Sequence, residues 1–369
     1  MSTNTFLEVK EIARQALPRL MENLVVPNLI HKDFSEEFAS GKGSKIQVRK
    51  PVLLEAETFD AEKGTTAQDI TETSVEVTLD QLATVDVELT ALQSATSVDD
   101  LNRIFVEPAA AALAQKINAD GLNLYKDIPY VCGTAGTTPS SLSAFADAEK
   151  VLNLNKAPVA PRYAVWSPEA DAAFKQIDAV VHAEKSGSTA ALRNGSIGRI
   201  FGLENHMSQA VKAHKAGKLS AAAKSKEAAN IGAETLTLAA TTLTGTLYKG
   251  DILTILDNTY VVTEDATATN NEIVVNIYPA LKKDITTNTA ITVAANHTAN
   301  LAFHPSAFAF VTRPLSTPSG VESYVTSFNG ISLRVTKGYD MKHKKDMLSM
   351  DVLYGYKTMY PELATRVLG

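Results

Sequence analysis

Hydrophobic residues recur at helical spacing in the first forty positions. Their separations are three or four residues, through Phe6, Val9, Ile12, Ala16, Leu20 and Leu24. Proline removes a backbone donor and clashes with the preceding turn, so Pro18 and Pro27 predict short helical pieces and not one rod. We interpret residues 1–40 as an N-terminal arm that docks on a neighbouring copy. An ordinary surface helix is the alternative.

From Gly41 the hydrophobic period changes to two, which is typical of half-exposed antiparallel strands. Apolar and polar residues alternate over 45–52, 75–79 and 85–89. Between the first two of these lies a polar stretch rich in carboxylates: Glu55, Glu57, Asp60, Glu62 and Asp69. Such a stretch covers little core by itself. Residues 41–95 are therefore predicted to form a projecting hairpin with flanking strands, and we expect its tip to reach an adjacent copy.

Helical spacing returns over residues 96–140. Ser97 and Asp100 have the spacing of a capping box before a first helix that presents Leu101, Ile104 and Phe105. Pro108 suits the first turn of a second helix. That helix is predicted to continue through Ala109, Ala112, Leu113, Ile117, Leu124 and Tyr125. Its alanine-rich face predicts close packing along the helix.

Residues 141–210 alternate between helical and strand patterns. A helical pattern with Phe145 at its start is followed by an apolar strand at 163–166, and Ser167-Pro168-Glu169 is typical of a new helix start. This alternation predicts a compact mixed α/β lobe.

The composition shifts over residues 211–299. A basic, alanine-rich stretch comes first, with Lys212, His214, Lys215, Lys218, Lys224 and Lys226. Short threonine-rich strands follow, separated by turn signals such as Lys249-Gly250-Asp251, Asp257-Asn258 and Asn270-Asn271. The pattern predicts a small β-barrel or sandwich inserted between two mixed segments. Apolar strands then fill residues 300–369, where Asn329-Gly330 is a strong hairpin signal.

Composition limits the classes of function. The 369 residues are 45% hydrophobic, which suffices for more than one packed unit, and the net charge of −6 disfavours a broad basic surface that grips nucleic acid. Residues 1–10 lack the pattern of a signal peptide, and no apolar run is long enough to predict a membrane span. Cys132 is the lone cysteine, so an intrachain disulfide and a four-thiolate zinc site are excluded and a cytosolic setting fits.

No catalytic, cofactor-binding or metal site is predicted, and no cofactor is expected. The histidines lack metal-ligand spacing, and His206 and His214 are too far apart for adjacent helical turns. Gly195-Ser196-Ile197-Gly198 with Gly202 has the wrong spacing for a phosphate loop and predicts a turn where backbones pack closely. The carboxylates from Glu55 to Asp69 have no apolar wall that would shift a pKa.

A second charged feature is the basic run of Lys342, His343, Lys344 and Lys345. A run this short is usually a solvated turn, and contact with phosphate is the less favoured alternative.

Seven stretches, taken in order, carry a resemblance to a known family. They are GSKIQVRKP at 43–51, VEVTL at 75–79 with VDV at 85–87, EPAA at 107–110 with ALA at 112–114, LRNGSIGR at 192–199 with Gly202, YKGDI at 248–252, NLAFH at 300–304 with Ala307 and Phe308, and DVLYG at 351–355. Together they resemble the coat proteins of short-tailed phages related to Salmonella phage P-twenty-two.

The resemblance implies an α+β chain with the Hong-Kong-97-type capsid fold. Its parts would be an N-terminal arm (1–40), an E-loop hairpin with flanking strands (41–95), a P-domain spine helix (96–140), an A-domain (141–210), an inserted β-barrel domain (211–299), and a return through A-domain and P-domain strands (300–369). Such a chain is a major capsid protein and not an enzyme. It forms pentamers and hexamers that close into an icosahedral shell around double-stranded DNA.

The same resemblance implies the partners. These are a scaffolding protein, a portal protein and packaged DNA, the last through weak non-specific contact only, with no membrane. Assembly would take place in the cytoplasm of the host bacterium, and the product would be the virion capsid. Two other classes stay open: a nanocompartment shell of the same fold, and a phage tail or receptor-binding structural protein. The inserted β-pattern argues against the first, and the alanine-rich helix and α/β lobe argue against the second.

Overall fold

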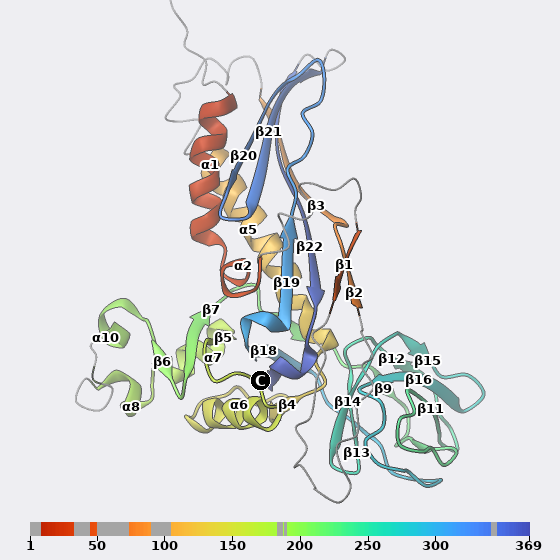
Figure 1. Cartoon of the computed structure of the whole chain (residues 1–369). Helices are drawn as coiled ribbons and strands as arrows, with labels where there is room; N and C mark the ends of the chain where they lie inside the picture. The colour runs from red at the N-terminus through yellow and green to blue at the C-terminus, as the bar shows by residue number, and fades with distance from the viewer. Residues whose placement is uncertain are drawn as a thin grey trace, which may run out of the picture.

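The computed structural model describes residues 9–32, 45–49, 74–89, 105–182, 187, 190–340 and 345–369. The chain mixes helices and strands throughout. Figure 1 shows an elongated upper body, a lower lobe of strands and helices, and a separate β-rich unit beside that lobe.

The upper body is built on a five-stranded antiparallel sheet. Its strands are β3 (Gln81–Leu89), β19 (Phe308–Thr312), β20 (Glu322–Phe328), β21 (Ile331–Asp340) and β22 (Lys345–Thr358). The long strand β22 pairs with β19, β21 and β3, and Met350 lies opposite both Val335 and Val85. Helices α1 (Val9–Asn23) and α5 (Glu107–Leu122) share one hydrophobic core with this sheet.

Helix α1 runs without a break through Pro18, so the prediction of separate pieces at that point was wrong. Pro18 lies on the exposed face, where water can satisfy the carbonyl that loses its partner. The opposite face buries Ala13, Leu17 and Leu20 in the core of the same chain. That packing outweighs the cost of the proline. The expected docking of residues 1–40 on a neighbouring copy stays a prediction. The break expected at Pro27 is confirmed, because α2 (Val26–Leu29) carries it in its first turn.

Helix α5 begins as predicted, with Pro108 in its first turn. It ends at Leu122, and the 3-10 helix η2 (Asn123–Asp127) takes the place of the predicted last turn. The packed alanines also differ from the expectation. Ala109, Ala110 and Ala114 are buried, whereas Ala112 faces solvent. Alanine occupies several faces of this helix, so its pattern does not indicate which face is covered.

The predicted hairpin is present at its base. Strand β1 (Lys45–Arg49) pairs antiparallel with β2 (Ser74–Thr78). The next strand, β3, leaves the hairpin and pairs with β22 in the upper body. Both the acidic stretch from Glu55 to Asp69 and the predicted cap at Ser97 lie outside the described residues.

The lower lobe contains a seven-stranded mixed sheet. Its strands are β4 (Val131–Gly133), β5 (Arg162–Trp166), β6 (Arg199–Ile200), β7 (Leu203–Met207), β8 (Ala213–His214), β18 (His297–Phe303) and β23 (Ala364–Leu368). Helices α6 (Ser143–Leu154), α7 (Pro168–Phe174), α8 (Asp178–Val181) and α10 (Ala190–Asn194) accompany it, with 3-10 turns η3 (Pro305–Ala307) and η4 (Pro361–Leu363). Phe145 packs against Trp166 and Phe174, with ring centroids 5.1 and 4.4 Å apart. The predicted helix start at Ser167 is confirmed, because its hydroxyl accepts from the Ala170 amide.

The β-rich unit leaves this sheet after β8 and rejoins it at β18. It contains β9 (Lys218–Leu219), β10 (Lys224–Ser225), β11 (Thr235–Ala239), β12 (Gly245–Leu247), β13 (Ile252–Ile255), β14 (Asn258–Val262), β15 (Ala266–Thr267), β16 (Glu272–Tyr278) and β17 (Thr292–Val293). One sheet has the order β10-β11-β16-β14-β13-β17 and the other β15-β12-β9. Residues of both sheets meet in a core separate from that of the body, including Leu238, Leu247 and Ile273.

The turn signals of the sequence are found as turns. Asn270 and Asn271 both have positive φ, as do Asp257 and Gly250. The hairpin at Asn329-Gly330 is confirmed, because Phe328 pairs with Ile331 across a two-residue turn with φ of 49° and 72°.

Candidate functional site

The residues considered as candidate sites in the sequence do not converge. Cys132 lies on β4, and burial raises the pKa of its thiol to about 12, so it stays protonated and unreactive at neutral pH. His206 on β7 lies 3.6 Å from Glu204, whereas His214 on β8 is in a different, buried environment. Of the basic run 342–345, the structure describes Lys345, whose ammonium contacts Glu88.

The glycines of the 195–202 segment serve the backbone conformation. Gly195, Gly198 and Gly202 have φ of 67°, 73° and 77°. A Cβ added at Gly198 or Gly202 would meet nothing within 4 Å. The predicted turn is therefore present, but the close backbone packing expected with it is not, and the left-handed φ is what requires glycine.

The described residues contain no group of three or more His, Cys, Asp or Glu side chains placed to hold a metal ion. Among the helices of the described ranges, none combines the length and the apolar character needed to cross a membrane.

A buried hydrogen-bonded chain joins Tyr125, His214 and Asp251. The Tyr125 hydroxyl lies 2.9 Å from His214 Nδ1, and His214 Nε2 lies 2.8 Å from Asp251 Oδ1. The exposed fractions of the three residues are 3%, 3% and 0%. Tyr125 belongs to η2, His214 to β8 and Asp251 to the turn before β13. These hydrogen bonds therefore connect the upper body, the lower lobe and the β-rich unit.

Asp251 is held by the local turn as well as by the imidazole. Its carboxylate accepts from the amides of Tyr248 at 2.7 Å and of Gly217 at 3.0 Å. Gly250 precedes it with φ of 99°, and a Cβ there would lie 2.8 Å from the Lys126 side chain. The Lys249-Gly250-Asp251 turn was recognisable in the sequence, but its burial against η2 was not.

Arg366 extends the network from β23. Its guanidinium donates to three backbone carbonyls: Gly250 at 2.8 Å, Ile128 at 3.1 Å, and Tyr125. It also lies 4.9 Å from the centroid of the Tyr125 ring. Burial lowers the pKa of Arg366 to about 9, so the side chain remains charged at neutral pH. A single cation thus joins the lobe sheet, the end of the α5 segment and the β-rich unit.

His297 completes the group at the point where the chain returns from the β-rich unit. Its Nδ1 donates to the Ala295 carbonyl at 2.8 Å, and its ring centroid lies 5.1 Å from that of His214. Its Nε2 is buried with no hydrogen-bond partner in the described structure. Burial is the main cause that lowers the pKa of His297, to about 4, so the ring is neutral at pH 7.

The order Asp251, His214, Tyr125 is chemically that of a proton relay, but its geometry favours a structural role. Burial raises the pKa of the Tyr125 phenol, which weakens it as a nucleophile. All three side chains are enclosed, whereas a reacting group must be open to its substrate.

Together with Arg366 and His297, these three residues form one buried group. We call the five residues Tyr125, His214, Asp251, His297 and Arg366 the junction.

The exposed apolar side chains are a second feature to explain. Leu154, Val159 and Leu192 are 72%, 73% and 72% exposed, and Phe201 and Met207 are also exposed. They come from α6, the following loop, α10 and the β6–β7 hairpin of the lower lobe. Exposed apolar side chains that form one contiguous patch are typical of a surface that another protein covers.

No protein-family model and no curated protein sequence matches the chain. Solved structures do match it. A chain from Mycobacterium phage Che8 aligns with a TM-score of 0.53 and 19% identity, over 93% of this chain and 90% of that one. The capsid of cyanophage P-SCSP1u aligns with a TM-score of 0.50 and 12% identity, over 89% and 84% of the two chains.

A third structure, the capsid of Ralstonia phage GP4, aligns with a TM-score of 0.50 and 10% identity, over 89% of this chain and 83% of that one. The chain has the phage capsid fold. The Hong-Kong-97-type architecture expected from the sequence is thereby confirmed.

Proposed function

We propose that the chain is the major capsid protein of a tailed bacteriophage, which self-assembles as pentamers and hexamers into an icosahedral shell around double-stranded DNA. The observation that carries the proposal is the likeness of fold to the capsids of phages P-SCSP1u and GP4, over 89% of this chain and 84% and 83% of the two capsid chains. The exposed apolar residues of the lower lobe support it, because pentamers and hexamers would bury them.

We further propose membership of the P-twenty-two-like coat proteins, with the domain boundaries given above. The separate core of the β-rich unit and its insertion between β8 and β18 support an inserted domain at 211–299. A scaffolding protein, a portal protein and weak contact with packaged DNA are the partners of this proposal. Assembly in the host cytoplasm and a final place in the virion follow from it.

A nanocompartment shell of the same fold is the alternative, and the β-rich unit argues against it on the basis of the sequence resemblance. A tail or receptor-binding protein is the second, and it is disfavoured by the capsid-like arrangement of α5 and the two sheets. An enzymatic role gains no support from the enclosed junction.

Expression with the scaffolding protein, followed by sedimentation and negative-stain microscopy, tests the proposal. We expect closed particles in the megadalton range. Tubes or small discrete assemblies would favour the tail alternative. Monomers alone, with the scaffold present, would contradict the proposal.

A further inference from the structure

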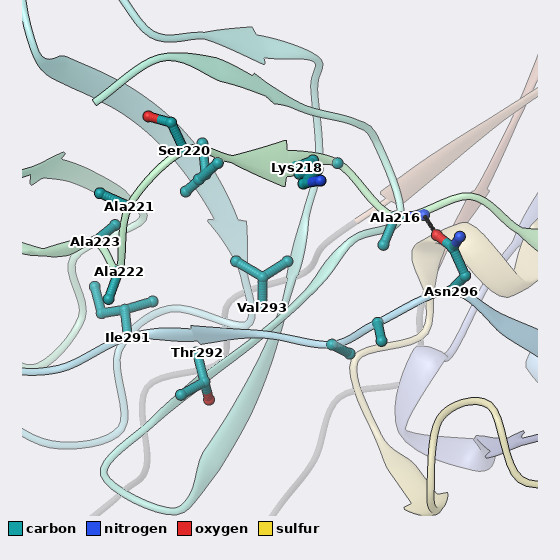
Figure 2. Close-up of a pocket in the computed structure, with 14 residues that line it drawn as sticks. Ala216, Lys218, Ser220, Ala221, Ala222, Ala223, Ile291, Thr292, Val293 and Asn296 are labelled. Atoms are coloured by element: carbon teal, nitrogen blue, oxygen red, sulfur yellow. Dashed lines mark hydrogen bonds between the residues drawn. The ribbon is translucent and has the colours of Figure 1, made fainter. Parts of the chain in front are cut away.

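Among the described residues, the two sheets of the β-rich unit are not hydrogen-bonded to each other along one pair of edges. Strand β9 is the edge of one sheet and β17 is the edge of the other. Each pairs on one side, β9 with β12 and β17 with β13. The facing sides border a cavity of about 630 Å³, lined by residues 216–223 and 291–296 (Figure 2). We call this feature the wall opening.

The wall opening is closed at both ends and unpaired between them. At one end the Ala216 amide donates to the Asn296 side-chain oxygen at 2.8 Å. At the other end the Ile291 amide donates to the Ala223 carbonyl at 3.3 Å. Among the strand pairings of the described residues, none joins 217–222 to 292–295. Two strand edges thus face each other without forming a ladder.

The lining is suited to an added strand. Alanine is the commonest lining residue, and Gly217 is among the others, so the backbones are not covered by large side chains. Below them lies the apolar core of the unit, to which Ala223 and Ile291 belong. Exposed sheet edges accept extended peptides through main-chain hydrogen bonds, and side-chain pockets select the sequence.

The rim of the wall opening is basic. The first lining run, residues 216–223, carries the exposed Lys218 and is flanked by the exposed Lys215 and Lys224. Residues 211–226 contain no carboxylate. Lys226 is engaged with Glu272 at 2.7 Å. The second run, 291–296, carries no charge. The charge therefore favours an acidic occupant.

The chain itself contains an occupant of this chemistry. Residues 54–62 read LEAETFDAE, with carboxylates at Glu55, Glu57, Asp60 and Glu62 and no basic residue. Because successive side chains of a strand point to opposite faces, Leu54, Ala56 and Thr58 would face the core while Glu55 and Glu57 face the lysine rim. The same alternation would turn Asp60 and Glu62 towards the core, so the added strand is limited to residues 54–58. We call residues 54–58 the acidic segment.

We propose that the wall opening accepts the acidic segment of a neighbouring copy as an added strand. The inference rests on the proposed function. Donor and acceptor are different surfaces of one chain, so the contact is head-to-tail, and such contacts close into rings when the rotation per subunit allows. Segment exchange of this kind would link each subunit of a pentamer or hexamer to the next.

Disulfide trapping tests the proposal. In a Cys132→Ser background, Ala222→Cys is combined in turn with Leu54→Cys, Ala56→Cys and Thr58→Cys, so that the result does not depend on one register. Particles are assembled with scaffold, oxidised mildly and run on a non-reducing gel. We expect at least one pair to give a ladder of covalent multimers. The control pairs each segment cysteine with Val274→Cys, which is exposed on β16 of the same unit, and should remain monomeric.

A charge swap gives a second readout. Lys218→Glu with Lys224→Glu should reduce the disulfide yield several-fold, and adding Glu55→Lys with Glu57→Lys should restore it. Normal particles without a multimer ladder would overturn the inference and leave the proposed function intact. Disulfides within one chain, located by peptide mass mapping, or a scaffold peptide seated in the wall opening would also overturn it. If the wild-type chain formed no particles, the proposed function itself would fail.

Discussion

Arg366 and Gly250 lie 116 residues apart in the sequence and are joined by a buried hydrogen bond of 2.8 Å from the guanidinium to the carbonyl. One residue belongs to the last strand of the lobe sheet and the other to the β-rich unit. The bond therefore fixes the unit onto the body at a point where no water is available to replace it.

Replacing Arg366 with Met should loosen this attachment. Three buried carbonyls would lose their charged donor, so we expect the free energy of unfolding to fall by at least about 2 kcal/mol. Amide hydrogen exchange should speed up in residues 245–262 before it does so in the upper body. The exposed Arg199→Met is the matched control. Unchanged exchange in the Arg366 variant would show that the attachment depends on other contacts.

Acid should weaken the junction through His297. Its pKa is lowered from about 6.5 in the unfolded chain to about 4 in the fold, mainly by burial. Between these values the unfolded chain binds a proton that the folded chain does not. Stability is therefore complete above about pH 6.5 and is lost progressively as the pH falls towards 4.

The test is the pH dependence of urea unfolding for His297→Gln, with the exposed His182→Gln as control. We expect a shallower loss of stability between pH 6.5 and 4.5 in the first variant and an unaltered one in the second. The same slope in His297→Gln and the wild type would refute the assignment.

Two alanines of α5 provide a matched pair for core packing. Ala110 is 1% exposed, whereas Ala112 faces solvent. Ala110→Phe should overpack the core at a cost of about 1–3 kcal/mol and reduce the soluble yield. Ala112→Phe should leave the subunit fold and its thermal melting unchanged. Equal melting temperatures for the two variants would mean that the buried face of α5 is assigned wrongly.

The β-rich unit should fold when excised as residues 211–299. It has a hydrophobic core of its own, which includes Leu238, Leu247 and Ile273. We expect a dispersed amide NMR spectrum of β type, with weaker protection near His214 and Gly250, where the contacts with Tyr125 and Arg366 are missing. A collapsed spectrum would show instead that the core needs the rest of the chain.

Local signals in the sequence predicted local structure well. Asn329-Gly330 formed the expected hairpin and Pro108 the expected helix start, because each depends on the backbone preferences of a few residues. The helix break predicted at Pro18 was wrong, because the tertiary packing of α1 outweighed the local cost of proline in a helix. The buried position predicted for Ala112 was wrong, because a helix with alanine on several faces does not show which face is covered.

The junction could not have been predicted from spacing. Tyr125 and Arg366 are 241 residues apart, and His214 and Asp251 are 37 apart, so only the fold brings them together. The Lys249-Gly250-Asp251 turn was visible in the sequence, but nothing local indicates that its carboxylate is buried against a histidine. The wall opening could not have been predicted either. It forms between the edges of β9 and β17, which are distant in the sequence and are brought together only by the fold.

Cryo-electron microscopy of the particles formed with the scaffolding protein shows whether this chain builds a closed shell. We expect an icosahedral reconstruction in which one copy of this fold repeats as pentamers at the fivefold vertices and as hexamers between them. The exposed Leu154, Leu192 and Phe201 of the lower lobe should be covered by neighbours. A reconstruction with helical symmetry, or isolated rings that never close, would contradict the claim.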